Sequence, residues 1–319
     1  MVGSHGNGGK PRWAWDSALR QALAFGLLAA ALILMFRLTS ASLHERGVHT
    51  GFGFLGQPAI TPVFNSPLSF EPGVDTFGKA FVAGALNSLK ITVAAIVGAT
   101  LVGLLVGVGT LARNPVARAL STGYVELMRN VPVLLIVMFW YGLMLELPAG
   151  SEASGTEWLL ASNRGIFLFP TIDGLDVQAL VSIQPEFAAL LVGISLYTAA
   201  FIAEIVRAAV GSLPHGQLEA ASALGLSSGA TLRHVLGPQA LRVGLPSLAS
   251  EYIGVFKNST LAVAIGYQDF MAVGDTMLTD TGQAVEIMAI TVAFYALVSL
   301  SVSALMHMYE HRHNRWSRS

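Results

Sequence analysis

The sequence predicts an all-α membrane protein with about six transmembrane helices. Three observations support this fold class: the composition, the long apolar stretches, and the loops in which basic residues occur. Hydrophobic residues make up 53% of the 319-residue chain and charged residues only 12%, with a mean hydropathy of +0.61. Such a chain prefers lipid to water as its solvent. Its net charge of -1 argues against a nucleic-acid partner.

A transmembrane helix needs about 20 largely apolar residues, and six stretches of the sequence meet this requirement. They lie at residues 17–38, 81–112, 130–148, 186–211, 246–268 and 284–308. The second stretch is long enough to tilt or to extend beyond the bilayer. Membrane lipid is therefore expected around most of the chain.

Basic residues occur in alternate connections between these stretches and at both ends of the chain. They are Lys10, Arg12, Arg20, Arg113, Arg118, Arg129, Arg233, Arg242, Arg312, Arg315 and Arg318. Because an excess of Lys and Arg marks cytoplasmic loops, both termini are expected in the cytoplasm. The segments 149–185 and 269–283 then lie outside, and both carry acidic residues.

The expected organisation follows from these stretches. A cytoplasmic tail (1–16) precedes a first transmembrane helix (17–38) and a periplasmic segment (39–80). A core transmembrane domain (81–308) and a cytoplasmic tail (309–319) complete the chain. The first helix also resembles a secretory signal, because small residues at 40–42 follow its apolar run. Arg37 separates the run from those small residues, which favours a retained helix.

One polar break, within residues 212–240, predicts two short helices joined by a bend. Pro214 suits the first position of the first helix, and Gly225 can take the left-handed conformation that ends it. Ser227 or Ser228 can cap a second helix, which the pair Gly237-Pro238 is expected to stop.

The spacing within this break resembles the EAA signature of the membrane subunits of ABC importers. Glu219-Ala220-Ala221 is followed after three residues by Gly225, and after nine more by Val235-Leu236-Gly237-Pro238. The resemblance implies that Glu219, Ala220, Ala221 and Gly225 form a coupling helix that docks on a separate ATPase. The sequence departs from the signature at Gly237, where the family usually has Leu. The alternative is an ordinary amphipathic cytoplasmic loop.

The resemblance extends over most of the chain from residue 46 and narrows to the polar amino-acid uptake family, as the Q-type permease of general L-amino-acid ABC transporters. It is carried by RGVHTGFGFL (46–55), AFVAGALNSLKIT (80–92), YVELMRNVPVLLIVMFWYG (124–142), AAFIAEIVRAAVGSLPHGQLEAASALG (199–225), and PQALRVGLPSL through KNSTLAVAIGYQDF (238–270). Ile136 stands where many relatives have Gln. The outer segment 150–185 is shorter than in the longest relatives, which carry extra spans there.

This resemblance implies a type I importer permease fold in the bacterial inner membrane and a set of partners. These are a second homologous permease subunit, a dimer of ATP-binding subunits, and a periplasmic amino-acid-binding protein. ATP and Mg are expected in the partner ATPase, with no cofactor in this chain. In agreement, Gly9-Lys10 is followed by Pro11 rather than by Ser or Thr, so the sequence has no P-loop.

Signals of enzymatic or metal chemistry are weak. The sequence contains no HExxH, no GxSxG and no cysteine, and His311 and His313 lie among basic residues that favour a cytoplasmic anchor over a metal site. The chain is therefore predicted to be a permease subunit and not an enzyme.

Polar residues within the apolar stretches are candidates for the translocation path, because a charge retained in the membrane should face protein or a water-filled cavity. Glu204 can pair with Arg207 on one helix face, or both can serve the cytoplasmic end of the fourth span. Hydroxyls in membrane helices can instead bond to their own backbone. The candidate path residues are Tyr197, Thr198, Glu204, Lys257, Asn258, Ser259 and Thr260.

The sequence thus predicts a subunit that carries L-amino acids across the inner membrane while a partner hydrolyses ATP. Two competing hypotheses remain at this point. The first is a self-sufficient transporter coupled to an ion gradient, which an inverted repeat would favour; no clear repeat is visible. The second is a membrane scaffold without a path, against which the polar residues at 257–260 argue.

Overall fold

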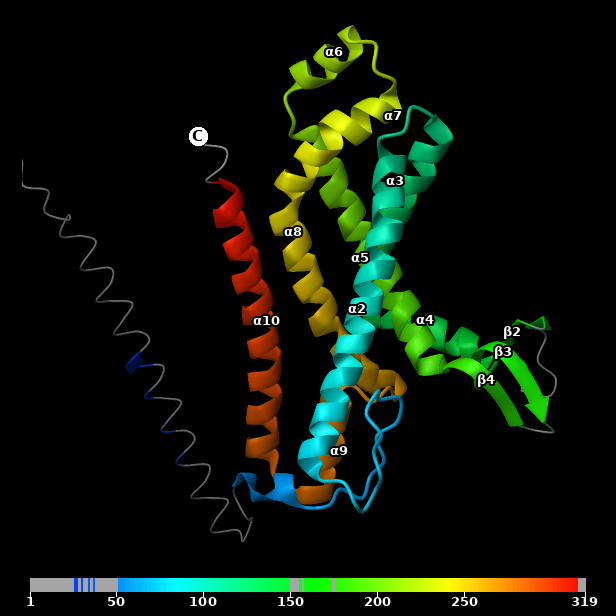
Figure 1. Ribbon diagram of the computed structural model, residues 1–319, viewed down its shortest axis with the longest axis vertical. Coiled ribbons are helices and arrows are strands. Elements are labelled where there is room, and N and C mark those ends of the chain that lie inside the picture. Colours follow the sequence, from blue (N-terminus) through cyan, green and yellow to red (C-terminus); the bar gives the residue numbers. More distant parts are fainter. Residues whose placement is uncertain are drawn as a thin grey trace, which may run out of the picture.

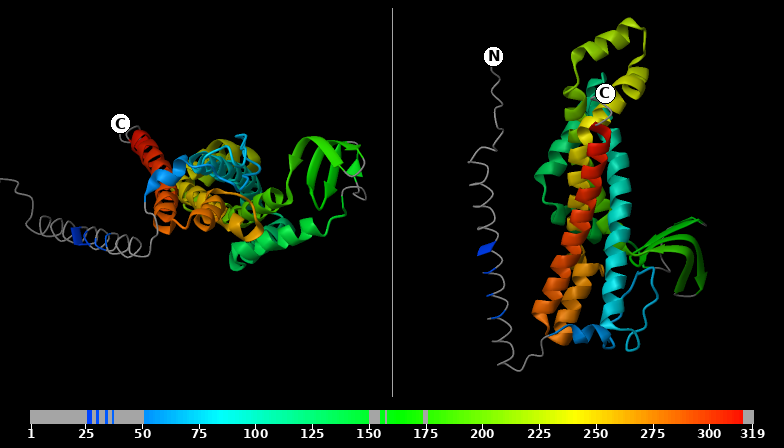
Figure 2. Two further views of the ribbon diagram at one scale, coloured as in Figure 1. Left: turned by 90° about the horizontal axis from the view of Figure 1, so that it is seen from below. Right: turned by 60° about the vertical axis from the view of Figure 1, so that its left-hand side comes forward.

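The computed structural model describes residues 51–149, 155–156, 158–173 and 176–314, together with Gly26, Leu27, Ala30, Leu34 and Arg37. The predicted tail 1–16 and nearly all of the predicted helix 17–38 lie outside the described residues. Within them, the chain forms an elongated helical bundle from which a small β-sheet projects (Figures 1 and 2).

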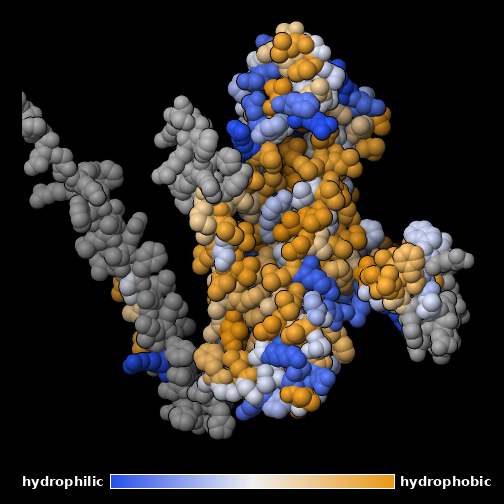
Figure 3. Space-filling model, viewed as in Figure 1, coloured by the Kyte–Doolittle hydropathy of each residue, from blue (hydrophilic) through white to orange (hydrophobic). Residues whose placement is uncertain are grey.

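Among the described residues, three long helices are apolar enough to cross a membrane. They are α2 (Phe77–Thr110), α5 (Pro185–Gly211) and α10 (Ala284–Asn314), the last over residues 284–306. A fourth candidate consists of α3 (Pro115–Asn130) and α4 (Val133–Leu145), which meet at a bend of 103°. Figure 3 shows the matching surface, with hydrophobic residues over the middle of the bundle and hydrophilic ones gathered towards its two ends.

Close helix packing explains the glycines of α2. A Cβ atom added to Gly103 would lie 2.7 Å from the side chain of Ile202 in α5, and one on Gly107 would lie 2.8 Å from Val206. Gly98 meets Ser195 in the same way, at 2.6 Å. These small residues therefore let α2 and α5 approach within the subunit, as small residues do in membrane helix pairs.

The predicted span 130–148 is shorter than expected. Its helix, α4, has 13 residues and a length of about 20 Å, below the roughly 30 Å of a hydrocarbon core. Pro132 precedes α4 rather than lying in its first turn, and Val131 is extended at φ -100° and ψ 129°. Proline disfavours a helical conformation at the residue before it, which ends α3 and produces the bend.

The expectation of an all-α fold is wrong for the outer segment. Four antiparallel strands form a sheet in the order β1-β2-β3-β4. They are β1 (Gly155–Thr156), β2 (Leu159–Ser162), β3 (Gly165–Asp173) and β4 (Asp176–Ile183). The sequences Asn163-Arg164-Gly165 and Asp173-Gly174 carry turn residues between apolar runs, and Gly165 has φ +138°. The protein is therefore mostly helical, with one β-sheet.

The C-terminal third departs from its predicted boundaries in two ways. The span predicted at 246–268 is α8 (Gly237–Asn258), which starts earlier and contains Pro246, followed by a 3-10 helix, η4 (Ser259–Ile265). The connection to α10, predicted as an outer loop, contains α9 (Phe270–Thr281). A short 3-10 helix, η1 (Phe52–Gly56), lies in the segment before α2.

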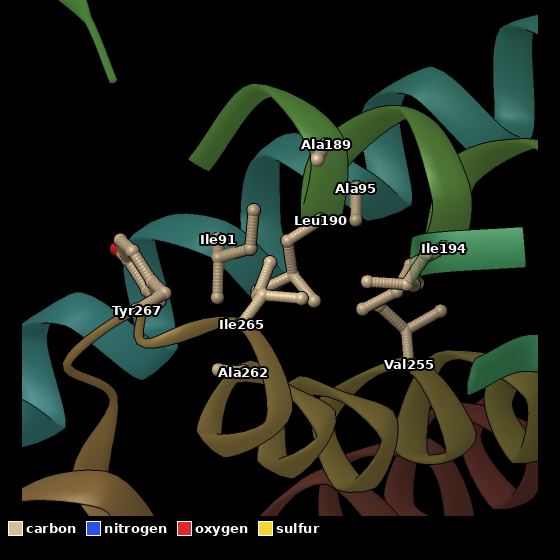
Figure 4. Close-up of a cluster of buried hydrophobic side chains, with 10 residues drawn as sticks. Ile91, Ala95, Ala189, Leu190, Ile194, Val255, Ala262, Ile265 and Tyr267 are labelled. Atoms are coloured by element: carbon tan, nitrogen blue, oxygen red, sulfur yellow. The ribbon is translucent and has the colours of Figure 1, made fainter. Parts of the chain in front are cut away.

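Three clusters of buried side chains hold the described bundle together, and the smallest of them joins Ala99 of α2, Ile202 of α5 and Leu248 of α8. In the first, Ile91 and Ala95 of α2 meet Ile194 of α5, Val255 of α8 and Ile265 of η4 (Figure 4). The second joins aromatic residues of η1, α2, α9 and α10: Phe54, Phe77, Phe81, Phe270, Phe294 and Tyr295. The rings of Phe270 and Phe294 stack with centroids 3.9 Å apart.

Candidate coupling segment and transmembrane path

The polar break forms a helical segment, residues 212–236, that extends beyond the end of α5 and is called the coupling segment (Figure 1). Its first helix is α6 (His215–Ala223). Pro214 lies immediately before it, at φ -58° and ψ 129°, rather than at the predicted first helical position. Gly225 is left-handed at φ +72°, as predicted, and the amide of Leu226 donates to the carbonyl of Ala221 at 3.1 Å. This closing pattern satisfies carbonyls that a helix end leaves free.

The signature residues occupy different positions on this segment. Glu219, Ala220 and Gly225 are exposed, whereas Ala221 is buried at 3% exposure. Next to Gly225, the side chain of Leu224 is 80% exposed. A Cβ atom on Gly225 would meet nothing within 4 Å. The requirement for glycine at position 225 is therefore one of backbone conformation and not of space.

The second helix does not stop at Gly237-Pro238, contrary to prediction. It begins as α7 (Ser228–Thr231), where the Oγ of Ser227 accepts from the amide of Ala230 at 3.3 Å. It continues through a π-helical turn, η3 (Leu232–Leu236), and runs into α8. Gly237 is helical, at φ -58° and ψ -52°, and Pro238 lies in the first turn of α8, where its missing N–H is tolerated.

The π turn gives the departure at Gly237 a physical reason. The amide of Gly237 donates to the carbonyl of Leu232, five residues back. This hydrogen bond brings the carbonyl close to the helix backbone, so that a Cβ atom on Gly237 would lie 2.6 Å from the Leu232 oxygen. Any side chain at this position would force the turn to rearrange. The segment from α7 to α8 is thus one continuous helical connection.

A cavity of ≈490 Å³ lies between the coupling segment and the ends of α2 and α5. Aliphatic side chains from both sides line it, including Leu111, Val210 and Leu232, and Arg113 lies at its wall. An apolar cavity, and not a close-packed core, therefore separates the coupling segment from the ends of α2 and α5.

Glu204 and Arg207 form the ion pair that their spacing predicts. The Nε of Arg207 donates to Glu204 Oε2 at 3.0 Å, and its Nη2 lies 2.5 Å from Oε1. Glu204 also lines a recess of ≈240 Å³ between α5 and α8, together with Ser212, Val243 and Ser247. The pair thus lies in the half of α5 that leads into α6, on the side that faces α8.

Tyr197 and Thr198 precede this pair in the chain and lie near the middle of α5. Thr198 is buried at 2% exposure. The ring of Tyr197 packs on Phe201 with centroids 5.0 Å apart, and the Arg129 guanidinium lies 5.5 Å from the same Phe201 ring.

Lys257, Asn258, Ser259 and Thr260 lie where α8 gives way to η4. The Ser259 hydroxyl donates to the carbonyl of Phe256 at 2.8 Å, and that of Thr260 to Lys257 at 2.7 Å, the local bonding that membrane hydroxyls adopt. Lys257 is exposed. Among the described residues, no ion pair includes Lys257, and no hydrogen bond joins Thr198 to this group.

The sequence did not lead us to predict one buried polar cluster. Asn87 of α2 is fully buried, and its Nδ2 donates to the carbonyls of Phe64, at 2.9 Å, and Gln268, at 2.8 Å. Nearby, buried Asp269 caps α9 and accepts from the hydroxyl of Tyr295 at 3.1 Å. The available signal was the adjacent pair Asn87-Ser88 inside an apolar stretch.

Ile136 and the two aromatic residues Trp140 and Tyr141 are structural in this arrangement. Ile136 is buried at 6% exposure on α4. Its neighbour Val137 packs against Gly193 of α5, where an added Cβ atom would lie 2.8 Å from the valine. Trp140 and Tyr141 pack against the first buried cluster.

The long apolar helices and the helical segment at one end of the bundle define an integral membrane permease. Comparison with known proteins identifies its kind. The chain belongs to the family described as "Binding-protein-dependent transport system inner membrane component", which it matches over residues 79–315. It is therefore a multi-pass inner-membrane component of a transport system and not the subunit that performs catalysis.

Individual relatives and a solved structure agree with this family. AapQ, a general L-amino acid transport system permease protein of Rhizobium johnstonii, is 32% identical over 96% of this chain and 95% of its own. BztB and BztC of Rhodobacter capsulatus, permease proteins of a glutamate/glutamine/aspartate/asparagine transport system, are 38% and 30% identical over 59% and 82% of this chain, and over 51% and 53% of their own. The crystal structure of an amino acid ABC transporter with histidines superposes with a TM-score of 0.59 at 26% identity, covering 74% of this chain and 95% of that one.

Proposed function

We propose that this chain is one half of an L-amino-acid permease in the bacterial inner membrane, driven by a separate ATPase that docks on α6. The similarity to AapQ over nearly the whole of both chains is the observation that supports the amino-acid substrate. The occurrence of two similar permease proteins, BztB and BztC, in one transport system supports a second homologous permease as the partner. A periplasmic amino-acid-binding protein would deliver the substrate.

The geometry of α6 supports the docking site. A helix of nine residues, ended by a left-handed glycine, presents exposed Glu219, Ala220 and Leu224 beyond the end of the bundle. After the left-handed turn at Gly225, α7 continues through the π turn into α8. Force applied by ATP-driven closure of two ATPase subunits would therefore reach a helix that packs on α5 near Glu204. ATP and Mg would be bound by those subunits.

Two glycines of the segment make a matched pair for testing the docking site. Gly216 and Gly225 both have open space where a Cβ atom would be placed, but only Gly225 has a positive φ. A non-glycine residue there costs roughly 1–2 kcal/mol. The variants Gly225→Val and Gly216→Ala would be purified from native membranes in mild detergent, and the co-purifying chains identified by mass spectrometry.

We expect a P-loop ATPase and a second permease to co-purify with the unmodified chain and with Gly216→Ala. Gly225→Val should insert into the membrane and keep the second permease but lose the ATPase. Equal recovery of the ATPase with Gly225→Val would exclude α6 as the docking element. Recovery of the chain with no ATPase in any variant would favour an ion-coupled transporter.

For the topology, we propose six spans with both termini in the cytoplasm. Support comes from α2, α5 and α10, from the bent pair α3 and α4, from α8 with η4, and from the apolar sequence 17–38. Because the chain has no cysteine, single cysteines can be labelled without background. A cysteine at Thr61 should react with an impermeant maleimide from outside, whereas one at Ser212 should react only in permeabilised cells; the reverse pattern would invert the topology.

A further inference from the structure

The β-sheet carries a row of large apolar side chains for which the bundle provides no cover. The register pairs Leu168 of β3 with Leu159 of β2 and Val181 of β4, so Trp158 and Leu180 lie opposite Phe169 on either side. The amide of Phe169 donates to the carbonyl of Trp158 at 2.9 Å. Trp158 is 57% exposed, Phe169 61% and Leu180 80%. These three side chains are called the apolar row below.

The backbone at the centre of the row is unfavourable for the residue it carries. Phe169 has φ +52° and is followed by Pro170. A bulky residue with positive φ is a genuine outlier, which Gly or Asn would relieve. Strain of this kind persists only where the surrounding structure imposes it, and it gathers at functional positions. Phe169 thus combines a strained backbone with an exposed ring.

The depth of the sheet follows from α2. The Nζ of Lys90 lies 4.9 Å from the ring centroid of Phe187, so the first turn of α5, and with it the end of β4, lies beside Lys90. From Lys90 to Thr110, α2 rises about 30 Å at roughly 1.5 Å per residue, which is about the hydrocarbon thickness of a bilayer. Arg113 follows. The root of the sheet and the coupling segment are thus separated along α2 by about the thickness of the hydrocarbon.

Several polar contacts lie near Lys90, at the same position along α2. Lys90 Nζ donates to the carbonyl of Asn65 at 2.9 Å, and the Asn65 amide donates to Gln184. The hydroxyl of Tyr141 donates to Glu186 at 3.4 Å. A ring of amphipathic and charged side chains at the edge of an apolar region is what the membrane interface selects. From this level the sheet projects sideways from the bundle (Figures 1 and 2).

We propose that the sheet is an interfacial membrane anchor, whose apolar row of Trp158, Phe169 and Leu180 lies among the lipid headgroups and upper acyl chains. Trp and other aromatic residues favour this zone because one part of the ring system is apolar and the other can stay hydrated. The depth of the sheet and its sideways direction place the row where lipid is available. The anchor fixes the depth of the α4–α5 connection in the membrane.

Tryptophan fluorescence tests the placement. The chain has five tryptophans, so Trp13, Trp15, Trp140 and Trp316 would be changed to Phe, which leaves Trp158 as the only emitter. The purified complex would be reconstituted into vesicles of phosphatidylethanolamine and phosphatidylglycerol. Quenching would then be compared between lipids brominated near the headgroup, lipids brominated near the chain end, and aqueous iodide.

We expect the shallow bromolipid to quench Trp158 at least twofold more than the deep one, with weak quenching by iodide. A matched control places the only tryptophan at Val74, which is 71% exposed in the segment before α2; Val74→Trp should be quenched by iodide alone. Adding Phe169→Ser and Leu180→Ser to the Trp158 reporter should lower its shallow quenching by half or more.

Each alternative location gives a different result. Quenching by iodide without bromolipid quenching would place the row in water. Protection from all three quenchers would place it against a protein partner, such as an extracellular subunit, and stronger quenching by the deep bromolipid would place it in the hydrocarbon. Any of these three outcomes overturns the interfacial anchor.

Discussion

The amide of Gly237 donates to the carbonyl of Leu232, five residues earlier, and this bond joins the coupling segment to α8 without a break. The two residues form the ends of a π turn, a rare conformation that often occurs at functional positions. Glycine at position 237 leaves room for the displaced carbonyl. The departure from the family's usual Leu is therefore matched by the local backbone.

Replacing Gly237 by Leu should disrupt this turn, because the new Cβ atom would lie 2.6 Å from the Leu232 oxygen. We expect a loss of about 1–3 kcal/mol in the free energy of unfolding and a lower amount of substrate transported per ATP hydrolysed. The measurements are thermal unfolding in detergent and coupled uptake in proteoliposomes. Gly229→Ala, where nothing lies within 4 Å of an added Cβ atom, is the control and should change neither. Unimpaired coupling in Gly237→Leu would show that the π turn has no part in it.

Substitutions at Gly225 should follow the cost of a left-handed residue. Asn tolerates that conformation better than Ala, and a β-branched residue tolerates it least. We therefore expect uptake to fall in the order Gly, Asn, Ala, Val. ATPase retained in pull-down assays should fall in the same order. If Ala and Asn were equivalent, side-chain volume at the docking surface would be the cause instead of backbone conformation.

Asn87→Ala should destabilise the part of the bundle where α2 meets α9 and the segment before α2. The side chain of Asn87 links α2 to the carbonyls of Phe64 and Gln268, and its removal would leave both acceptors unpaired in a buried site. The expected loss is about 1–3 kcal/mol in the free energy of unfolding, read from thermal unfolding. Asn130→Ala removes an exposed amide that bonds only to Glu126 of its own helix, and should cost less. Equal stability of the two variants would contradict this role of Asn87.

Gly103→Val should separate α2 from α5, since even a Cβ atom at this position lies 2.7 Å from the Ile202 side chain. Overpacking of this kind costs typically 1–3 kcal/mol, so the melting temperature of the purified chain should fall. Gly123→Val in α3, where an added Cβ atom meets nothing within 4 Å, provides the comparison. A similar effect of both changes would mean that valine in a helix, and not the α2–α5 contact, lowers stability.

Much of the helical plan could be read from the sequence, because apolar length and local backbone preference determine it. The predicted spans 186–211 and 284–308 correspond closely to α5 and α10, and the left-handed Gly225 follows from the conformational freedom of glycine. The stop predicted at Gly237-Pro238 failed because a glycine followed by proline also fits a π turn that leads into a new helix. Nothing local distinguishes the two outcomes.

The sheet and the buried polar cluster depend on contacts between distant residues. Strands β3 and β4 pair through a register that no short sequence window contains, and the acidic residues around them suggested only a loop. Asn87 acquires its partners from positions 64 and 268. For the transmembrane path, the Glu204–Arg207 ion pair could be predicted because both residues lie on one helix. That Thr198 and residues 257–260 line the path stays a prediction.

The π turn between α7 and α8 also provides a way to rotate α8. It contains one residue more than an α-helical turn, and each residue of an α-helix turns the chain by about 100° and advances it by about 1.5 Å. If the extra residue moved along the helix under load from the coupling segment, every side chain that it passed would turn to a new neighbour. A push of a few ångströms at one end would then emerge in the membrane as a twist of α8 against α5.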